Sequence, residues 1–247
     1  CMFYQWYELN HAVLQPYRAM ADATRLLYQH PLNPMSRNAI GRSIAAVAEL
    51  FERTTRQYSK PAFNLPHTHV DFSDVSVTEE RVWSRPFCDL IHFKRDLPAK
   101  RRQDPKILLV APMSGHYATL LRGTVEAFLP HAEVYITDWA DAREVPLYEG
   151  RFDLDSFIDY LIEFVHTLGP STHVIAVCQP AVPSLVATAL MAARNDDVQP
   201  ASLILMGGPI DTRRNPTKVN ELAAARSIDW FERNVINTVP FPHPGFM

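Results

Sequence analysis

The stretch from Ser171 to Arg194 constrains the fold more than any other part of the sequence, because it places a cysteine between a strand and a helix. Its beginning, His173–Val177, has the β-branched and small residues typical of a buried parallel strand. An alanine-rich run follows and predicts a helix, with Pro183 in the first turn, where a missing N–H costs little. Cys178 lies between these two elements.

This arrangement allows two interpretations of Cys178. A nucleophile at such a turn is lifted above the sheet, and the N–H of the next residue, Gln179, points at a developing oxyanion. The usual pattern for the turn is G-x-S-x-G, whereas this chain reads Ala176-Val177-Cys178-Gln179-Pro180. Alternatively, Cys178 is a packing residue that ends a core strand, since unpaired cysteine is among the most buried residue types. The local pattern leaves both interpretations open.

Composition and charge narrow the class of protein. The chain has 247 residues, of which 47% are hydrophobic and 21% charged, as in an ordinary globular domain. A net charge of −3 gives no electrostatic argument for binding nucleic acid or an anionic membrane. The sequence contains no run of apolar residues long enough for a membrane span and no signal peptide. Three cysteines form no disulfide framework, so we expect a cytoplasmic protein.

Residues 2–60 are rich in aromatic residues and helix formers. We expect Pro16 to break or kink the first helix, and a second to run as far as Tyr28. Ser36 is the expected N-cap of a further helix that extends to about Tyr58. One apolar face of that helix would contain Ile40, Ile44, Val47, Leu50 and Phe51. This region either covers the rest of the domain, which we favour, or forms an apolar docking surface.

Residues 60–71 are expected to form a proline-broken linker, so the domain border is placed between residues 72 and 73. His67, His69 and Asp71 have the outline of a metal site. The metallo-β-lactamase pattern requires another histidine after the aspartate, however, and Phe72 stands there. We therefore expect no metal.

The remainder of the chain predicts a parallel sheet preceded by a hairpin. Alternating residues over 75–96 indicate antiparallel strands joined near Arg85-Pro86, with Cys88 as a packing residue. From Lys106 onward, strands and helices alternate, which is typical of a parallel sheet. The expected strands are Ile107–Ala111, Glu133–Thr137, His173–Val177 and Ser202–Met206, and the expected helices are Tyr117–Phe128, Asp155–Leu168 and Ala181–Arg194.

This order is that of an α/β-hydrolase, with Cys178 at the end of the third parallel strand and the fifth strand overall. The order favours the nucleophile interpretation of Cys178, because the nucleophile elbow belongs at that place. The second oxyanion donor of the fold follows the first parallel strand, so the N–H of Met113 or Ser114 is the candidate. Gly115 permits a sharp turn there. His116 is either a base or a residue that fixes this loop, and we favour the second role.

Three longer motifs carry a resemblance to a known family. They are A-P-M-S-G-H-Y-A-T-L-L-R-G-T-V at Ala111–Val125, V-C-Q-P-A-V-P at Val177–Pro183 and L-M-G-G-P-I-D at Leu205–Asp211. With them the chain resembles the intracellular polyhydroxybutyrate depolymerases, from Met2 to Met247. It is more distantly similar to polyhydroxyalkanoate synthases, whose cysteine lies in a G-x-C-x-G elbow. Pro180 departs from that glycine and favours the depolymerases.

The resemblance implies a cytoplasmic polyester hydrolase that acts on storage granules, without a cofactor, through a Cys178 acyl-enzyme. In the family, the catalytic acid and base lie on the last strands, beyond a lid, and no Asp–His pair here fits those positions. Asp211 is where some hydrolases of this fold keep the acid, but without a base its expected role is capping. We therefore expect residues 73–247 to be a partial core that lacks the last strands and ends where a lid begins.

Two alternatives to this function stay open. One is a synthase-like acyltransferase that uses the same cysteine. The other is a non-catalytic α/β-hydrolase scaffold that binds granules. Neither the oligomeric state nor the preferred side-chain length of the polymer follows from the sequence.

Overall fold

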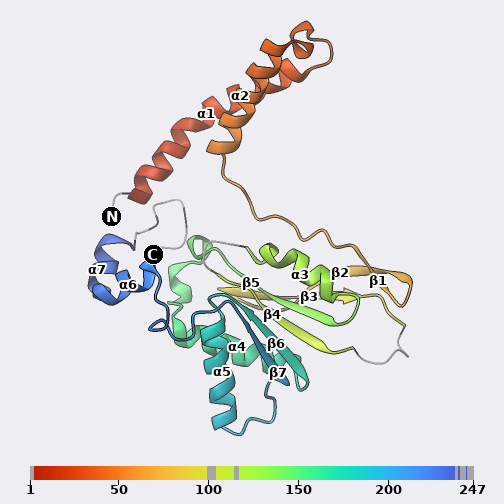
Figure 1. Ribbon diagram of the computed structural model, residues 1–247, viewed down its shortest axis with the longest axis vertical. Helices are drawn as coiled ribbons and strands as arrows, with labels where there is room; N and C mark the ends of the chain where they lie inside the picture. Colours follow the sequence, from red (N-terminus) through yellow and green to blue (C-terminus); the bar gives the residue numbers. More distant parts are fainter. Residues whose placement is uncertain (1–2, 99–103, 114–116, 237–238, 240–242, 244–247) are drawn as a thin grey trace. The chain divides into compact units, whose positions relative to one another are not determined.

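The structure is a computed structural model that describes residues 3–98, 104–113, 117–236, 239 and 243. It divides into two compact units. One comprises described residues within 1–59 and 227–242, and the other comprises those within 60–226 together with His243. The second unit holds the sheet (Figure 1). Within the described residues, no helix is long and apolar enough to cross a membrane.

The first unit contains two long helices that pack on each other, α1 (Phe3–Gln29) and α2 (Ala39–Thr55), as well as α7 (Ile228–Asn234). Of the break or kink expected at Pro16, the break is wrong, because α1 continues through this residue. Pro16 deprives only one carbonyl of its donor, that of Ala12, and both residues are exposed, so water can hydrate that oxygen.

The predicted start of the next helix is also wrong. Ser36 lies in a short 3₁₀ turn, η1 (Pro34–Arg37), and the N-cap of α2 is Asn38, whose side chain accepts a hydrogen bond from Gly41 N at 2.7 Å. The residues of α2 that are buried are the small ones: Gly41, Ala45 and Ala48. The larger residues of the predicted apolar face, Ile40, Val47 and Leu50, are exposed. Small residues let two helix backbones approach closely, and this decides which face packs.

The second unit is built on a seven-stranded sheet in the order β1-β2-β3-β5-β4-β6-β7. The strands are β1 (His67–Val70), β2 (Ser73–Arg85), β3 (Cys88–Arg95), β4 (Lys106–Val110), β5 (Glu133–Trp139), β6 (Thr172–Val177) and β7 (Ser202–Met206). The first three strands pair antiparallel with their neighbours, and β5, β4, β6 and β7 run parallel to one another. The predicted hairpin and all four predicted parallel strands are confirmed.

Strand β1 corrects the predicted linker. It pairs with β2 through a two-residue connection, Asp71-Phe72, in which both residues have positive φ (47° and 68°). Such a connection suits the twist of a hairpin, but it normally contains Asn or Gly, so the residue types here did not indicate it. Because of β1, the strand before Cys178 is the sixth and not the fifth. His67 and His69 both lie near Asp74, and no group of three potential ligands among the described residues could hold a metal ion.

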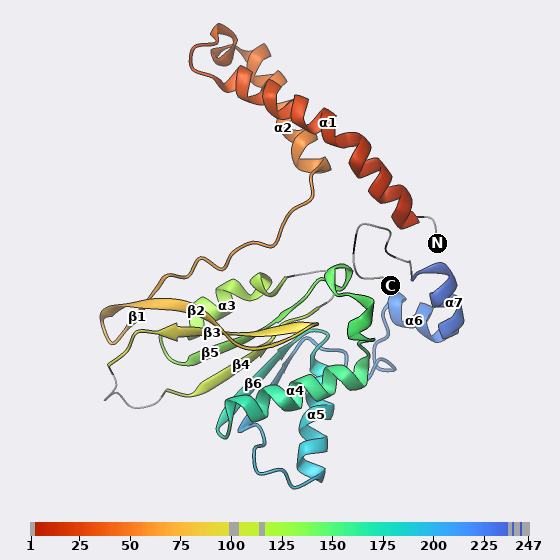
Figure 2. The same ribbon diagram turned by 180° about the vertical axis from the view of Figure 1, so that it is seen from behind.

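Helices cover both faces of the sheet (Figures 1 and 2). On one face, α4 (Leu154–Leu168) and α5 (Ala181–Ala193) pack on Leu90, Leu108, Val174 and Ala176. On the other face, η2 (Ala118–Leu121) and α3 (Arg122–Phe128) pack on Leu109, Ile136 and Ile175. The short helices η3 (Ala142–Glu144), η4 (Leu147–Glu149) and α6 (Lys218–Ala225) complete this unit. A mixed sheet in this strand order, with helices on both faces, is the predicted α/β-hydrolase fold, preceded by a helical extension.

A partly buried network at the start of β5 predicts a pH-dependent part of the stability. Glu133 accepts hydrogen bonds from His92 (2.8 Å) and Arg95 (2.7 Å), and these bonds lower the pKa of its carboxyl group. Because the folded-state pKa is depressed, the stabilisation is present above the unfolded-state pKa of about 4.3 and is lost as the pH falls through the folded-state value.

We therefore expect Glu133→Gln to lower the free energy of unfolding by about 1–2 kcal/mol at neutral pH. The loss should shrink at an acidic pH below the depressed folded-state pKa of Glu133, where the native carboxyl is also protonated. Urea denaturation of both proteins at the two pH values measures this difference. An equal loss at both would show that the charge of Glu133 contributes nothing.

Candidate active site

Cys178 forms the apex of a sharp turn between β6 and α5. Its backbone φ of 66° is one that residues other than glycine rarely adopt, and Cys178 is exposed. The turn occupies residues 178–180, and α5 begins at Ala181. A strained φ at an exposed cysteine between a strand and a helix is the backbone geometry that a nucleophile elbow requires.

Close contacts with the segment after β7 hold this turn. Cys178 N donates to Met206 O at 2.7 Å, and Ala181 N donates to Cys178 O at 3.1 Å. A Cβ atom at Gly208 would lie 2.0 Å from Ala181 Cβ and 2.8 Å from Cys178 O, so only glycine fits there. The small residue that the elbow pattern lacks at Pro180 is therefore compensated by Gly208, which sequence reasoning missed. The paired glycines after β7 were the available signal.

One predicted oxyanion donor lies in the turn, and the other follows the neighbouring strand. Gln179 lies in the turn itself, and Met113 follows β4, the strand next to β6. Two hydrogen bonds fix the start of the Met113 segment, because Ala111 N donates to Thr137 Oγ1 (2.9 Å) and Trp139 Nε1 donates to Ala111 O (2.8 Å). The structure thus brings Met113 and Gln179 to one edge of the sheet. Ser114, Gly115 and His116 lie outside the described residues.

The carboxylate and histidine candidates have partners elsewhere. Asp211 accepts two hydrogen bonds from the Arg213 guanidinium (2.8 and 3.0 Å) and one from Arg213 N, and these bonds lower its pKa. This is the capping role that the sequence suggested. His173 is the second residue of β6 and lies near the end opposite Cys178. The histidine contacts are His173 Nδ1 with Ser202 Oγ (2.8 Å), His166 Nε2 with Asp196 (2.7 Å) and His243 Nδ1 with Glu144 (3.1 Å). Among the hydrogen bonds of the described residues, none joins a histidine to Cys178 Sγ.

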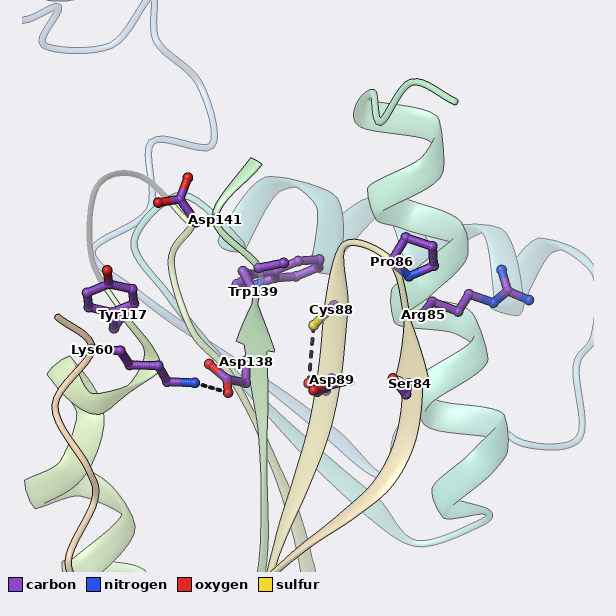
Figure 3. A pocket seen from close by; sticks show the side chains of 11 residues that line it. Lys60, Ser84, Arg85, Pro86, Cys88, Asp89, Tyr117, Asp138, Trp139 and Asp141 are labelled. Atoms are coloured by element: carbon purple, nitrogen blue, oxygen red, sulfur yellow. Dashed lines mark hydrogen bonds and ion pairs between the residues drawn. The ribbon is translucent and has the colours of Figure 1, made fainter. Parts of the chain in front are cut away.

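A pocket of about 450 Å³ opens at the carboxyl end of β5, beside the beginning of β3 (Figure 3). Its lining residues are Lys60, Ser84, Arg85, Pro86, Cys88, Asp89, Tyr117, Asp138, Trp139, Ala140 and Asp141. Lys60 and Asp138 form an ion pair there. In open α/β sheets, ligands bind at the carboxyl ends of the parallel strands, which is where this pocket lies. Sequence reasoning missed it, although a polar residue at the end of a buried strand, Asp138, was a usable signal.

Comparison with known proteins gives one family match. Residues 207–247 match the family model described as PHB de-polymerase C-terminus. The chain is therefore similar to this family over the last 41 of its 247 residues. No curated protein matches it significantly.

Several solved structures are similar to this chain at low sequence identity. N-formylmaleamic acid deformylase from Pseudomonas putida is 19% identical, with a TM-score of 0.39 over 63% of this chain and 54% of that one. A fungal esterase from Rhizomucor miehei is 12% identical, with a TM-score of 0.41 over 62% and 50%. An ester hydrolase from the metagenome of Lake Arreo is 14% identical, with a TM-score of 0.45 over 87% and 68%. The chain thus spans about half the length of the first two.

The two cysteines that the structure describes have opposite environments. Cys88 is 1% exposed, its Sγ donates to Asp89 O at 3.3 Å, and burial raises the pKa of its thiol. Cys178 is exposed at the turn. Since the thiolate is the reactive form, the two thiols should differ strongly in reactivity.

We predict that iodoacetamide modifies Cys178 in the folded protein and modifies Cys88 only after unfolding, with rates that differ by about a hundredfold or more. Peptide mapping by mass spectrometry separates the two positions from each other and from Cys1. Equal rates for Cys88 in the folded and unfolded protein would contradict its assignment as a packing residue.

Proposed function

We propose that the protein hydrolyses ester bonds of 3-hydroxybutyrate polymers, with Cys178 as the nucleophile. The observation that carries this proposal is the backbone at Cys178, where a positive φ of 66° lifts an exposed thiol between β6 and α5. The match of residues 207–247 to a depolymerase family model and the α/β-hydrolase fold both support the reaction class. The proposal of a polymer substrate is based on the family match and on the motifs around Cys178.

The chemistry begins at the thiolate of Cys178. It attacks the ester carbonyl carbon, and the negative charge that develops on the oxygen is stabilised by the N–H groups of Gln179 and Met113. The tetrahedral species collapses, the C–O bond to the rest of the polymer breaks, and the departing alkoxide takes up a proton. Water then attacks the thioester, releasing the acid and restoring the thiol. The N-terminus of α5 lies beside Cys178.

The experiment that tests this proposal uses the full chain and amorphous polymer. We expect release of 3-hydroxybutyrate or its short oligomers into solution, measured by chromatography. A synthase-like acyltransferase would instead lengthen chains when it is given hydroxyacyl-CoA, and a non-catalytic scaffold would do neither. Chain extension without release, or no reaction at all, would overturn the proposal.

The substrate also determines where such an enzyme works. A polymer of this kind is insoluble in water, so we propose that the protein acts at the surface of storage granules in the cytoplasm. Co-sedimentation of the purified protein with amorphous granules should exceed co-sedimentation with an equal area of a bare hydrophilic particle by about tenfold. Equal binding to the two surfaces would contradict this part of the proposal.

A further inference from the structure

The pocket beside β5 contains one polar pair that is directed into it. Several of its charged residues are engaged by other partners. Arg85 points away and pairs with Glu163 at 2.9 Å, Asp141 pairs with Arg143 at 2.6 Å and Asp89 pairs with Arg81 at 3.2 Å (Figure 3). Lys60 and Asp138 face each other near the Tyr117 ring (Figure 3). Recognition in this pocket therefore depends on Lys60 and Asp138.

The carboxylate of Asp138 is only half satisfied. Oδ2 pairs with Lys60, whereas Oδ1 is enclosed and has no hydrogen-bond partner among the residues that the structure describes. Leaving a buried acceptor unpaired costs about 1–3 kcal/mol, and more for a charged group. Because Oδ1 is enclosed, a ligand in the pocket would contact this carboxylate at Oδ2, beside Lys60.

The strand register places this pocket beside Cys178. Ile136 on β5 and Ile175 on β6 both pair with Leu109 of β4, so these three residues are level across the sheet. Trp139 and Cys178 each come three residues later, at the same edge. Two strand spacings separate them, which is about 10 Å. One extended chain molecule can therefore have its ester at Cys178 and its end in the pocket.

We propose that this pocket binds the free hydroxyl end of a 3-hydroxyacyl chain whose ester bond lies at Cys178. A hydroxyl group donates to Asp138 and accepts from Lys60, so it satisfies both members of the pair. Asp138 and Asp141 disfavour a carboxylate end, and Lys60 disfavours a cationic one. Trp139 and Pro86 provide apolar contacts for the carbon chain. This inference rests on the proposed function, since it names the part of the substrate that the site recognises.

The test measures binding and needs no turnover. The protein is the full chain with Cys178→Ala, and the probes are methyl 3-hydroxybutyrate and its O-methyl ether, methyl 3-methoxybutyrate. Binding is followed by NMR through the indole N–H signal of Trp139, one of four tryptophans, which is assigned with Trp139→Phe. We expect saturable binding of the free hydroxyl compound, with a Kd about tenfold lower than that of the ether.

Two variants sharpen this test. Asp138→Asn should raise the Kd for the hydroxyl compound about tenfold and abolish the preference over the ether. The matched control, Asp159→Asn, changes an exposed carboxylate on α4 and should leave both values unchanged. Equal Kd values for the two probes in the protein with Asp138 intact would overturn the inference, and this comparison stands even if Asp138→Asn does not fold. Failure of polymer hydrolysis is a separate result and would not change the measured Kd values, because no step of the binding measurement requires hydrolysis.

Discussion

Replacement of Cys178 by alanine is expected to lower kcat/KM for ester hydrolysis by a factor of about 10³ or more. The substitution removes the only atom that can form the acyl-enzyme and leaves the sheet untouched, since the Cys178 side chain is exposed at the turn. The measurement is the initial rate of release of 3-hydroxybutyrate from soluble oligomers. Circular dichroism and the thermal midpoint of unfolding should match those of the unsubstituted protein within a few degrees.

Two controls make this result specific. Cys1→Ala is the matched substitution, and it should retain full activity because Cys1 takes no part in the proposed chemistry. A brief incubation of the unsubstituted protein with an oligomer, followed by acid quench, should yield a thioester adduct on the peptide that contains Cys178. Retention of more than a third of the activity by Cys178→Ala, or an adduct on a different peptide, would remove Cys178 from the mechanism.

The position of the elbow was accessible from sequence because its signals are local. A short apolar strand, a single cysteine and an alanine-rich helix lie within 24 consecutive residues, and the structure confirms each boundary to within one residue. The succession of parallel strands along the chain then followed from the alternation of strand-like and helix-like hydrophobic patterns. The backbone at Cys178 has the predicted geometry, while its role as a nucleophile stays a prediction.

The wrong predictions concern a helix cap, a hairpin connection and a proline, where the residue present is not the one that usually occupies such a position. Asn38 caps α2 in place of Ser36, because its side chain reaches Gly41 N. Asp71 and Phe72 form a tight hairpin connection without Asn or Gly. Pro16 stays inside α1 because only one exposed carbonyl loses its hydrogen bond. Propensity describes averages over many proteins, and solvent exposure or one side-chain contact decides each case.

The pocket and the support of the elbow were inaccessible for a different reason. Lys60 and Asp138 are 78 residues apart in the sequence. Gly208 follows β7 and lies against Ala181, which follows the neighbouring strand β6. No local pattern relates residues at such separations, so these contacts require the tertiary structure. The sequence therefore predicts the position of a candidate nucleophile. The residues proposed to select its substrate can be identified only from the tertiary structure.

Gly208→Ala is expected to have a large effect, because it disturbs the elbow from outside. The added Cβ would overlap Ala181 Cβ at 2.0 Å and Cys178 O at 2.8 Å, so the start of α5 and the turn must both shift. Overpacking of this kind costs about 1–3 kcal/mol in the free energy of unfolding. A displacement of the reacting atom by about 1 Å is enough to lower kcat/KM about a hundredfold. Urea denaturation and oligomer hydrolysis measure the two effects.

Two glycines serve as controls for this substitution. Gly123 lies in α3, and a Cβ atom added there would meet no described atom within 4 Å, so Gly123→Ala should be neutral or stabilising by about 0.5–1 kcal/mol. Gly207 has a φ of 65° but open space around it, so Gly207→Ala reports the backbone strain without the overlap. If Gly208→Ala lowers activity no more than Gly207→Ala does, contact between this segment and the elbow does not position Cys178. A loss confined to Gly208→Ala shows that the glycine after β7 replaces the one missing at Pro180.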